Sequence, residues 1–452
     1  MNITIHIVAF LFAVIVLVLF HEYGHYVAAR FFQVKVRRFS IGFGKPWYIW
    51  RSKKSDVEFA FAPILLGGYV RLSDSREEKI TKADLPFTFD HKPILQRAII
   101  MLAGPLASIM LAFFAFWLML VIGIEMPKPV VGKILPSSLA QIAQIKPGDE
   151  IVVVDKRKTN SWRDVVADII MRFGDTNVLR IYTTTSPLAT PKLHQIDLNK
   201  LVIDALQPDP LHDLGIVPYK PFVPAIVGEV QANSPAYTLL QPDDKVVMVN
   251  HTKISSWDDL ITYVQAHPEQ TLQLKVLRHK QPLSVAVTSS WKFGKGWKRV
   301  GYIGVKSIPV VWPSQMLREI KYPLVKAFIP ALQEIQKLFV FNAVVITKLI
   351  LGKISLQALG GPLSIYQAST HALQQGIESF IGFLAVLSVM LAFFNLIPLP
   401  GLDGGYCFFL LIEGIFHKPL SVRVQMLIMR IGIILILLLF FRAMLNDVLR
   451  LF

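Results

Sequence analysis

His21-Glu22-Tyr23-Gly24-His25 follows directly on an uncharged apolar run from Ile3 to Phe20. Histidines at positions i and i+4 lie on one face of a helix, so both can bind a single metal ion. Glu22, the next residue after His21, would then face a water on that metal. Ionisable side chains are costly at the end of a helix long enough to cross a bilayer, and they usually serve a function there. The stretch therefore predicts a metal site within a membrane.

The composition indicates a membrane protein with several domains. Of its 452 residues, 53% are hydrophobic and 17% are charged, which is typical of a chain with several membrane spans. The formal net charge is +16, but no basic run alternates with aromatic residues and no helix-turn-helix pattern occurs, so we expect no nucleic acid as a partner. The positive charge is expected beside the headgroups of the lipid bilayer. A single cysteine, Cys407, excludes an internal disulfide and a Cys-rich metal site.

Four transmembrane helices are expected. They cover residues 1–32, 98–124, 377–405 and 424–446. The loop at 33–97 is basic, with 14 Lys or Arg from Arg30 to Arg97 against 7 Asp or Glu, and no Lys or Arg precedes Arg30. The positive-inside rule therefore places this loop in the cytosol and the N-terminus outside.

The cytosolic loop contains two stretches with β-like patterning. One is Phe39–Gly44, and the other runs from Val57 to Pro63 and on from Ile64 to Val70 through Gly67-Gly68. Alternating polar and aromatic positions, punctuated by Pro and Gly, predict a membrane-associated β-hairpin with an exposed edge. An ordinary amphipathic hairpin on the membrane surface is the alternative.

A duplication occupies the polar middle of the chain. Val131-Gly132-Lys133-Ile134 matches Val227-Gly228-Glu229-Val230, 96 residues later, and Ser161-Trp162 matches Ser256-Trp257, 95 residues later. Matches at a nearly constant spacing are expected of duplicated domains. The two predicted domains cover residues 127–220 and 221–309. Their order of strands and helices resembles that of PDZ domains, which bind extended peptides by strand addition. Two β-rich spacers without a working groove are the alternative.

Residues 310–376 are predicted to form an amphipathic helical segment outside the cytosol. Leu317 to Leu351 has a helical pattern with interleaved Lys and Glu. Such a basic amphipathic stretch is typical of a helix that lies along the membrane surface, and we expect Pro323 and Pro330 to bend it.

A catalytic metal site needs a third protein ligand besides His21 and His25. Asp403 is the best candidate, because it directly follows a span and is surrounded by prolines and glycines that break the helix. Cys407, four residues further on, is interpreted as a packing residue.

Membrane depth links Asp403 to the topology. The first helix runs from outside to inside with its motif near the inner end, so the helix that leads to Asp403 must run the same way. The second span has already returned the chain to the outside. Residues 310–376 therefore cannot make a net crossing, and both termini and the duplicated domains are expected outside.

Taken together, the motifs resemble the site-2 protease family, the intramembrane zinc metalloproteases of peptidase family M50. The resemblance rests on HEYGH at the end of the first span, Ala103-Gly104-Pro105 in the second, Asn395–Gly405 after the third, and the PDZ-like pair between spans. It implies a polytopic α-helical membrane protein with two inserted PDZ-like domains. One departure is Ser108, where the family often has Asn in a packing position.

By the same resemblance, His21, His25 and Asp403 bind one Zn2+ per chain and Glu22 is the catalytic acid and base. Two further groups of residues would hold the substrate. The resemblance assigns this role to Asn395, Pro398 and Pro400 after the third span, and to Gly67, Gly68, Tyr69 and Val70 in a membrane re-entrant β-loop.

The implied activity is cleavage of the transmembrane segments of single-span membrane proteins. The implied substrates are an anti-sigma factor and remnant signal peptides, and the implied location is a bacterial inner membrane. Both termini and the PDZ-like domains would be periplasmic, with the active site near the cytosolic face. A catalytically silent PDZ scaffold and a metal transporter are the alternatives. The intact Glu22 argues against the scaffold, and the lack of inverted repeats among the spans argues against the transporter.

Overall fold

The computed structural model describes residues 3–53, 56–76, 78–173, 178–186, 188–201, 209–294 and 298–450. The chain divides into two compact units. One comprises Met1–Glu125 and Glu319–Leu445, and the other comprises Met126–Arg318 with Asn446–Phe452. The first unit contains most of the long apolar helices and a four-stranded sheet, and the second contains the two β-rich repeats.

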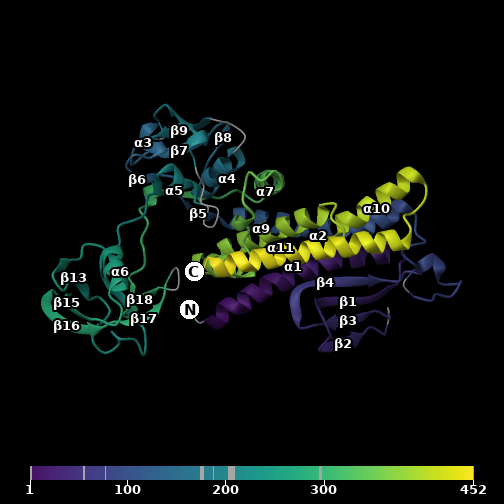
Figure 1. Cartoon of the computed structure of the whole chain (residues 1–452), viewed down its shortest axis with the longest axis horizontal. Helices are drawn as coiled ribbons and strands as arrows, with labels where there is room; N and C mark the ends of the chain where they lie inside the picture. Colours follow the sequence, from purple (N-terminus) through teal and green to yellow (C-terminus); the bar gives the residue numbers. More distant parts are fainter. Residues whose placement is uncertain are drawn as a thin grey trace. The chain divides into compact units, whose positions relative to one another are not determined.

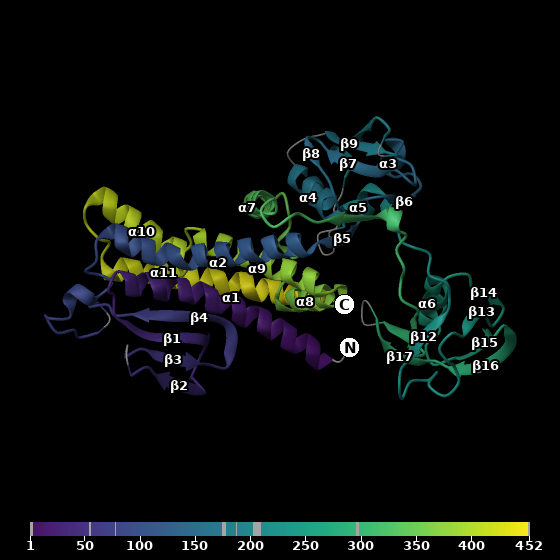
Figure 2. The same cartoon turned by 180° about the vertical axis from the view of Figure 1, so that it is seen from behind.

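Helix α2 stands at the centre of the first unit, where it packs against α1, α7, α9 and α10. Figure 1 and Figure 2 both show α1, α2 and α9 side by side. The helices are α1 (Ile3–Phe31), α2 (Ile94–Ile122), α7 (Phe328–Ile350), α8 (Pro362–Gln375), α9 (Ile377–Leu396), α10 (Asp403–Phe416) and α11 (Val422–Leu449). In the described part of the chain, α1, α2, α7, α9 and α11 are long and apolar enough to cross a bilayer. The prediction that only four of these cross it remains a prediction.

Small residues let α1 approach α2 closely. A Cβ atom on Gly24 of α1 would lie 2.2 Å from the carbonyl oxygen of Ala103 on α2, and one on Gly104 would lie 2.2 Å from Nε2 of His25. Any larger side chain at these two glycines would push the helices apart, which is why small residues are common where membrane helices cross.

The segment between α1 and α2 forms a four-stranded sheet, not the expected hairpin. Its strands are β1 (Val36–Phe43), β2 (Tyr48–Arg51), β3 (Glu58–Phe61) and β4 (Ile64–Leu72), in the order β2-β3-β1-β4. β1 lies between β3 and β4, parallel to the former and antiparallel to the latter. The link between β3 and β4 crosses the end of β1 at Gly42, where a Cβ atom would lie 2.4 Å from the carbonyl oxygen of Ala62. Gly42 has a φ of +90°, a conformation that glycine adopts without strain, so the link passes over β1 instead of turning back on β3.

The segment after the repeats also differs from the prediction. Leu317–Ile320 is a strand, β20, that pairs with β5 (Ile124–Pro127), so the expected helix from Leu317 is wrong. Pro323 has no amide hydrogen to continue a helix, and α7 begins only at Phe328. Pro330 lies in the first turn of α7, where its missing amide breaks no intrahelical bond, so it causes no bend there.

The end of the third predicted span also needs correction. α9 ends at Leu396, and the chain runs through an irregular connector before α10 begins at Asp403. The predicted range of 377–405 therefore joins one helix, its connector and the start of another. The predicted break ahead of Asp403 is confirmed, because Pro398 and Pro400 cannot continue a helix and Gly401 has a φ of +99°.

The duplicated sequences fold in the same way. The first repeat has a sheet in the order β10-β9-β7-β8, and the second has the matching order β16-β15-β13-β14. Each has one main helix, α4 (Trp162–Arg172) or α6 (Trp257–Ala266), capped by Ser161 with Asp164 or by Ser256 with Asp259. The strands of these sheets are β7 (Glu150–Val154), β8 (Arg157–Lys158), β9 (Val178–Thr184), β10 (Lys192–Asp197), β13 (Lys245–Val249), β14 (Thr252–Lys253), β15 (Thr271–Arg278) and β16 (Gln281–Thr288).

Short strands close each repeat on itself. In the first, β6 (Val131–Ile134) pairs with β11 (Ile216–Pro218), and in the second, β12 (Val227–Val230) pairs with β19 (Val305–Ser307). The second repeat also has a hairpin of β17 (Ser290–Phe293) and β18 (Arg299–Tyr302). Each repeat has its own buried apolar core. The duplication is therefore visible in the structure as well as in the sequence.

Candidate metal centre

His21, Glu22 and His25 lie on α1, and all three are buried, with 6%, 8% and 6% of each residue exposed. One helical turn separates the two histidines, and their ring centroids are 5.1 Å apart. Burying three ionisable groups within about one turn of a membrane helix costs free energy. Such clusters therefore occur mainly at functional sites.

Asp403 brings the far end of the chain to the two histidines. Its Oδ2 atom lies 3.1 Å from Nε2 of His21 and 3.2 Å from Nε2 of His25. Asp403 is the first residue of α10, where the positive end of the helix dipole favours a carboxylate. The three ligand atoms all lie within 4.8 Å of one another. The structure therefore brings together His21, His25 and Asp403, the three residues expected from the sequence to be ligands.

Glycines after Asp403 allow the connector to fold against the start of α10. A Cβ atom on Gly404 would lie 2.4 Å from the carbonyl oxygen of Ile397, and one on Gly405 would lie 2.3 Å from that of Leu399. Both approaches are too close for a side chain. The two glycines thus let α10 begin at Asp403, with the carboxylate held at the level of the histidines.

Helix α2 orients both imidazoles from behind. Nδ1 of His25 lies 2.8 Å from the carbonyl oxygen of Ile100, and Nδ1 of His21 lies 3.0 Å from Oγ of Ser108. Ser388 of α9 in turn donates from its hydroxyl to the backbone carbonyl of Ser108 at 2.7 Å. From the sequence, Ser108 was expected only to occupy a packing position. Its place one turn after the Ala103-Gly104-Pro105 stretch was the available signal that it contacts the metal site.

The protonation of these histidines tests whether a metal fits. A carbonyl oxygen can only accept a hydrogen bond, so Nδ1 of His25 carries a proton and donates to Ile100. In the neutral ring, Nε2 then keeps a free lone pair, which is the form that binds a metal. Neutral His21 with its proton on Nδ1 presents Nε2 in the same way. Both Nε2 atoms face the buried Oδ2 of Asp403, so the three atoms together can bind one cation.

Zinc is the metal that this donor set fits. Two imidazoles and one carboxylate, with one position left open, are a known ligand set of catalytic zinc sites. The hydrogen bonds from His21 and His25 to groups behind them also match the usual support of zinc-bound histidines. Cys407 is not part of the converging group.

The edge strand β4 lies against the same turn of α1. A Cβ atom on Gly68 would lie 2.7 Å from Cγ1 of Val18 and 3.1 Å from Cγ of Glu22. The backbone amide of Val70 faces the Glu22 carboxylate. Tyr69 stacks on Phe43, with the ring planes at 9°. Gly67, Gly68, Tyr69 and Val70, predicted to contact substrate, thus belong to a strand that touches Glu22.

The other predicted substrate-binding residues lie where α9 ends. Asn395 is half-buried in the last turn of α9, and its side-chain nitrogen donates to the carbonyl oxygen of Leu391 at 3.0 Å. Pro398 and Pro400 lie in the connector to Asp403, with Pro398 exposed. The connector places these residues near the ligand Asp403 in sequence, and their role toward a substrate remains a prediction.

Known proteins match nearly the whole length of this chain in sequence. The model of peptidase family M50 matches residues 9–439. The regulator of sigma-E protease RseP of Escherichia coli K12 is 36% identical over 447 residues, which cover 98% of each chain. Its counterpart in Salmonella typhimurium is 36% identical over 452 residues, or 99% of each chain. A putative zinc metalloprotease of Vibrio cholerae is 31% identical over 450 residues, or 98% of each chain.

Replacing Ser108 with Ala is expected to weaken zinc binding by about 10- to 100-fold, because His21 would lose the group that fixes its tautomer and ring orientation. The measurement is competition for zinc with a chelator of known affinity, on the full chain in detergent. Ser388→Ala is the matched control, since Ser388 bonds the backbone carbonyl of Ser108 and not its hydroxyl. An unchanged zinc affinity in Ser108→Ala would contradict the role given to this hydroxyl.

Proposed function

Because the chain belongs to peptidase family M50, we propose that His21, His25 and Asp403 hold the single Zn2+ of an intramembrane metalloprotease and that Glu22 is its general base. The observation that carries this proposal is the convergence of two histidine Nε2 atoms on a buried carboxylate oxygen. The chain is a multi-pass inner-membrane protein and a zinc metalloprotease. The proposal assigns the chemistry to particular residues.

When bound, Zn2+ polarises a peptide carbonyl and lowers the pKa of a water molecule to about 7. Glu22, buried beside His21, accepts the proton of the attacking water on its carboxylate. It then returns that proton to the nitrogen of the leaving amine, so that one side chain acts as base and then as acid. Gly68 of β4 packs against the Glu22 side chain, which links the position of β4 to that of the base.

A transmembrane helix must unwind before its peptide bonds can be attacked, since its carbonyls are bonded within the helix. We propose that the unwound segment adds as a strand to β4. Three features support this. Among the described residues, β4 pairs with no strand other than β1, so its other edge has no strand partner. The strand contacts Glu22, and strand addition is a common way to hold extended peptides. Asn395, Pro398 and Pro400 would contact the segment from the side of α9.

The sheet itself is well suited to a lipid environment. Trp47, Tyr48 and Trp50 are 72%, 65% and 54% exposed. A cavity of about 550 Å³ lies between α1 and the sheet, with an almost entirely apolar lining that includes Tyr23, Tyr26 and Phe59. Aromatic side chains gather where proteins meet the membrane interface. These observations support a membrane-embedded sheet beside the site.

The membrane topology that we propose has four crossings, by α1, α2, α9 and α11. Asp403, just after α9, lies at the level of His21 and His25 near the end of α1, so α1 and α9 must run in the same direction. α2 returns the chain once, and a further crossing by α7 would reverse α9, since α8 has only 14 residues and is too short to cross back. The basic cytosolic loop then leaves both termini and the repeats in the periplasm.

We propose that the repeats are PDZ-like and control access to the site. In the second repeat, a cavity of about 150 Å³ lies between α6 and the stretch from Gly301 to Val305. Its lining includes Leu260, Val264 and Tyr302, so it could receive an apolar residue of a peptide. By their size, the repeats would also exclude substrates with bulky periplasmic domains. The names of the relatives point to sigma-E regulation, so the substrates would be a membrane-bound anti-sigma factor and remnant signal peptides.

Replacing Glu22 with Gln is expected to lower the cleavage rate of a helical membrane substrate by about 10³-fold, the scale of a lost general base. Zinc content should stay at one per chain, because Glu22 is not a ligand. His21→Ala is the matched variant, and it should lose zinc and activity together. Zinc-free wild-type protein, or an unchanged cleavage rate in Glu22→Gln, would refute the assignment.

Strand addition predicts that proline scanning of the substrate reveals intolerant positions on either side of the scissile bond. A proline removes the amide hydrogen that pairs with β4, so cleavage should fall at alternate residues, as in a β-ladder. The rates would be measured with the unmodified enzyme, which keeps its zinc site constant. Prolines far along the substrate helix serve as controls. Equal rates at every position near the scissile bond would argue against pairing with β4.

Deleting residues 131–307, which carry both repeats including the closing strand β19, is expected to permit cleavage of a substrate that keeps its periplasmic domain. The intact chain should cleave only the trimmed form. A trimmed substrate is the internal control, since both proteins should process it. If the deleted chain cleaves the trimmed form but spares the untrimmed one, the size-exclusion role is wrong.

A further inference from the structure

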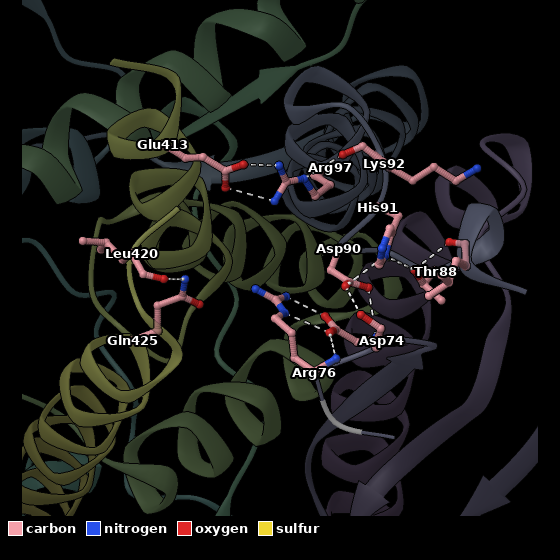
Figure 3. Close-up of polar contacts among 12 residues, drawn as sticks. Asp74, Arg76, Thr88, Asp90, His91, Lys92, Arg97, Glu413, Leu420 and Gln425 are labelled. Atoms are coloured by element: carbon pink, nitrogen blue, oxygen red, sulfur yellow. Dashed lines mark hydrogen bonds and ion pairs between the residues drawn. The ribbon is translucent and has the colours of Figure 1, made fainter. Parts of the chain in front are cut away.

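Helix α10 is anchored at its far end by a buried ion pair. Arg97, in the first turns of α2, reaches Glu413 on α10 through both guanidinium nitrogens, with N–O distances of 3.1 and 2.5 Å. The two side chains are only 8% and 16% exposed. Figure 3 shows the fork of Arg97 facing both carboxylate oxygens of Glu413. This bidentate geometry defines both the distance and the relative orientation of the two groups.

The same helix carries Asp403. Asp403, Tyr406, Leu410 and Glu413 follow one another at intervals of three and four residues, so they share one face of α10. Ten residues of helix place Glu413 about 15 Å beyond Asp403. A shift or rotation of α10 at Glu413 is therefore transmitted to the carboxylate at its first residue.

Arg97 is itself held by the segment of α2 that orients the histidines. Its Nε donates to the carbonyl oxygen of Lys92 at 2.9 Å, which fixes the guanidinium against the start of the helix. Three residues later, the carbonyl of Ile100 accepts the hydrogen bond from His25. One short stretch of α2 thus touches a histidine ligand on one side and the helix of the carboxylate ligand on the other.

Neighbouring groups enclose the pair. A cavity of only about 20 Å³, enough for one water, is lined by Arg76, Arg97, Tyr406, Glu413 and Gln425. Nε of Arg76 donates to Asp74 at 2.8 Å, and Figure 3 shows Arg76 beside Asp74 and Asp90. Gln425 comes from α11. The cytosolic segment, α2, α10 and α11 therefore meet around this pair.

We propose that Arg97 and Glu413 are positioning residues that determine where α10 presents Asp403 to the two histidines, and so how long the metal stays bound. This rests on the proposed role of Asp403 as a zinc ligand. A buried ion pair contributes little net stability compared with apolar packing, and defining one arrangement is its better-attested role. Removing one partner leaves the other charge buried and unpaired, which also lowers the stability of the fold, so the effect on the site must be measured well below the unfolding temperature.

The test measures how fast zinc leaves the full chain in detergent when a chelator is added, at a temperature well below unfolding. Glu413→Gln, which changes the charge and keeps the shape, is expected to release zinc about 10-fold faster, the lower end of the effect of groups that support metal ligands. Arg97→Lys keeps the charge but loses the fork, and its release rate should lie between that of Glu413→Gln and that of the wild type. Thermal unfolding, measured in parallel, separates loosening of the site from loss of the fold.

Lys35→Gln is the matched control, because it removes the exposed ion pair of Lys35 with Asp84 in the same cytosolic segment and should leave zinc release unchanged. Asp403→Asn tests the underlying site and should release zinc fastest. If Asp403→Asn speeds release while Glu413→Gln does not, the positioning role is wrong and the site stands. If Asp403→Asn holds zinc as long as the wild type, the site assignment itself fails.

Discussion

The meeting of Asp403 with His21 and His25 is the constraint on which the rest of the membrane unit depends. A carboxylate from the last part of the chain must reach two histidines in the second half of α1, at contacts of 3.1 and 3.2 Å. That requires α9 to run parallel to α1, and it requires α9 to end early so that a new helix can begin at Asp403. Prolines and glycines in the connector make that break, at a depth where irregular backbone is tolerated only within protein. The order of the spans and the broken helix thus follow from a single contact.

Helix α2 serves as the frame of the site although it provides no ligand. It holds His25 through Ile100 and His21 through Ser108, and it holds α10 through Arg97. Gly104 leaves room for the imidazole of His25. In their neutral form, His21 and His25 present lone pairs beside the carboxylate of Asp403, so the framework suits a bound cation. The selection of zinc, the geometry of the ligands and the packing of the helices are therefore aspects of the same arrangement.

Much of this could be predicted from local sequence, and the errors share one physical cause. The long apolar helices α1, α2, α9 and α11 were visible from hydropathy, the repeats from their register, and Asp403 from the helix breakers around it. The position of β1 between β3 and β4 was missed because strand order depends on pairing between distant residues, which alternation along one strand does not record. The strand at Leu317–Ile320 was missed for the same reason, since its partner β5 lies far away in the chain. The place of Ser108 after Ala103-Gly104-Pro105 indicated only packing, and the Arg97–Glu413 pair gave no signal beyond residue type, because contacts between helices determine their roles.

X-ray absorption at the zinc edge, on the full chain in detergent, tests the central claim most directly. A centre built from His21, His25 and Asp403 should show only nitrogen and oxygen neighbours at about 2.0–2.2 Å, with the signature of two imidazoles. In Asp403→Asn the spectrum should change while the signature of the imidazoles persists in any zinc retained. A sulfur neighbour at about 2.3 Å, which only a cysteine could supply, would contradict the account, as would a spectrum that Asp403→Asn leaves unaltered.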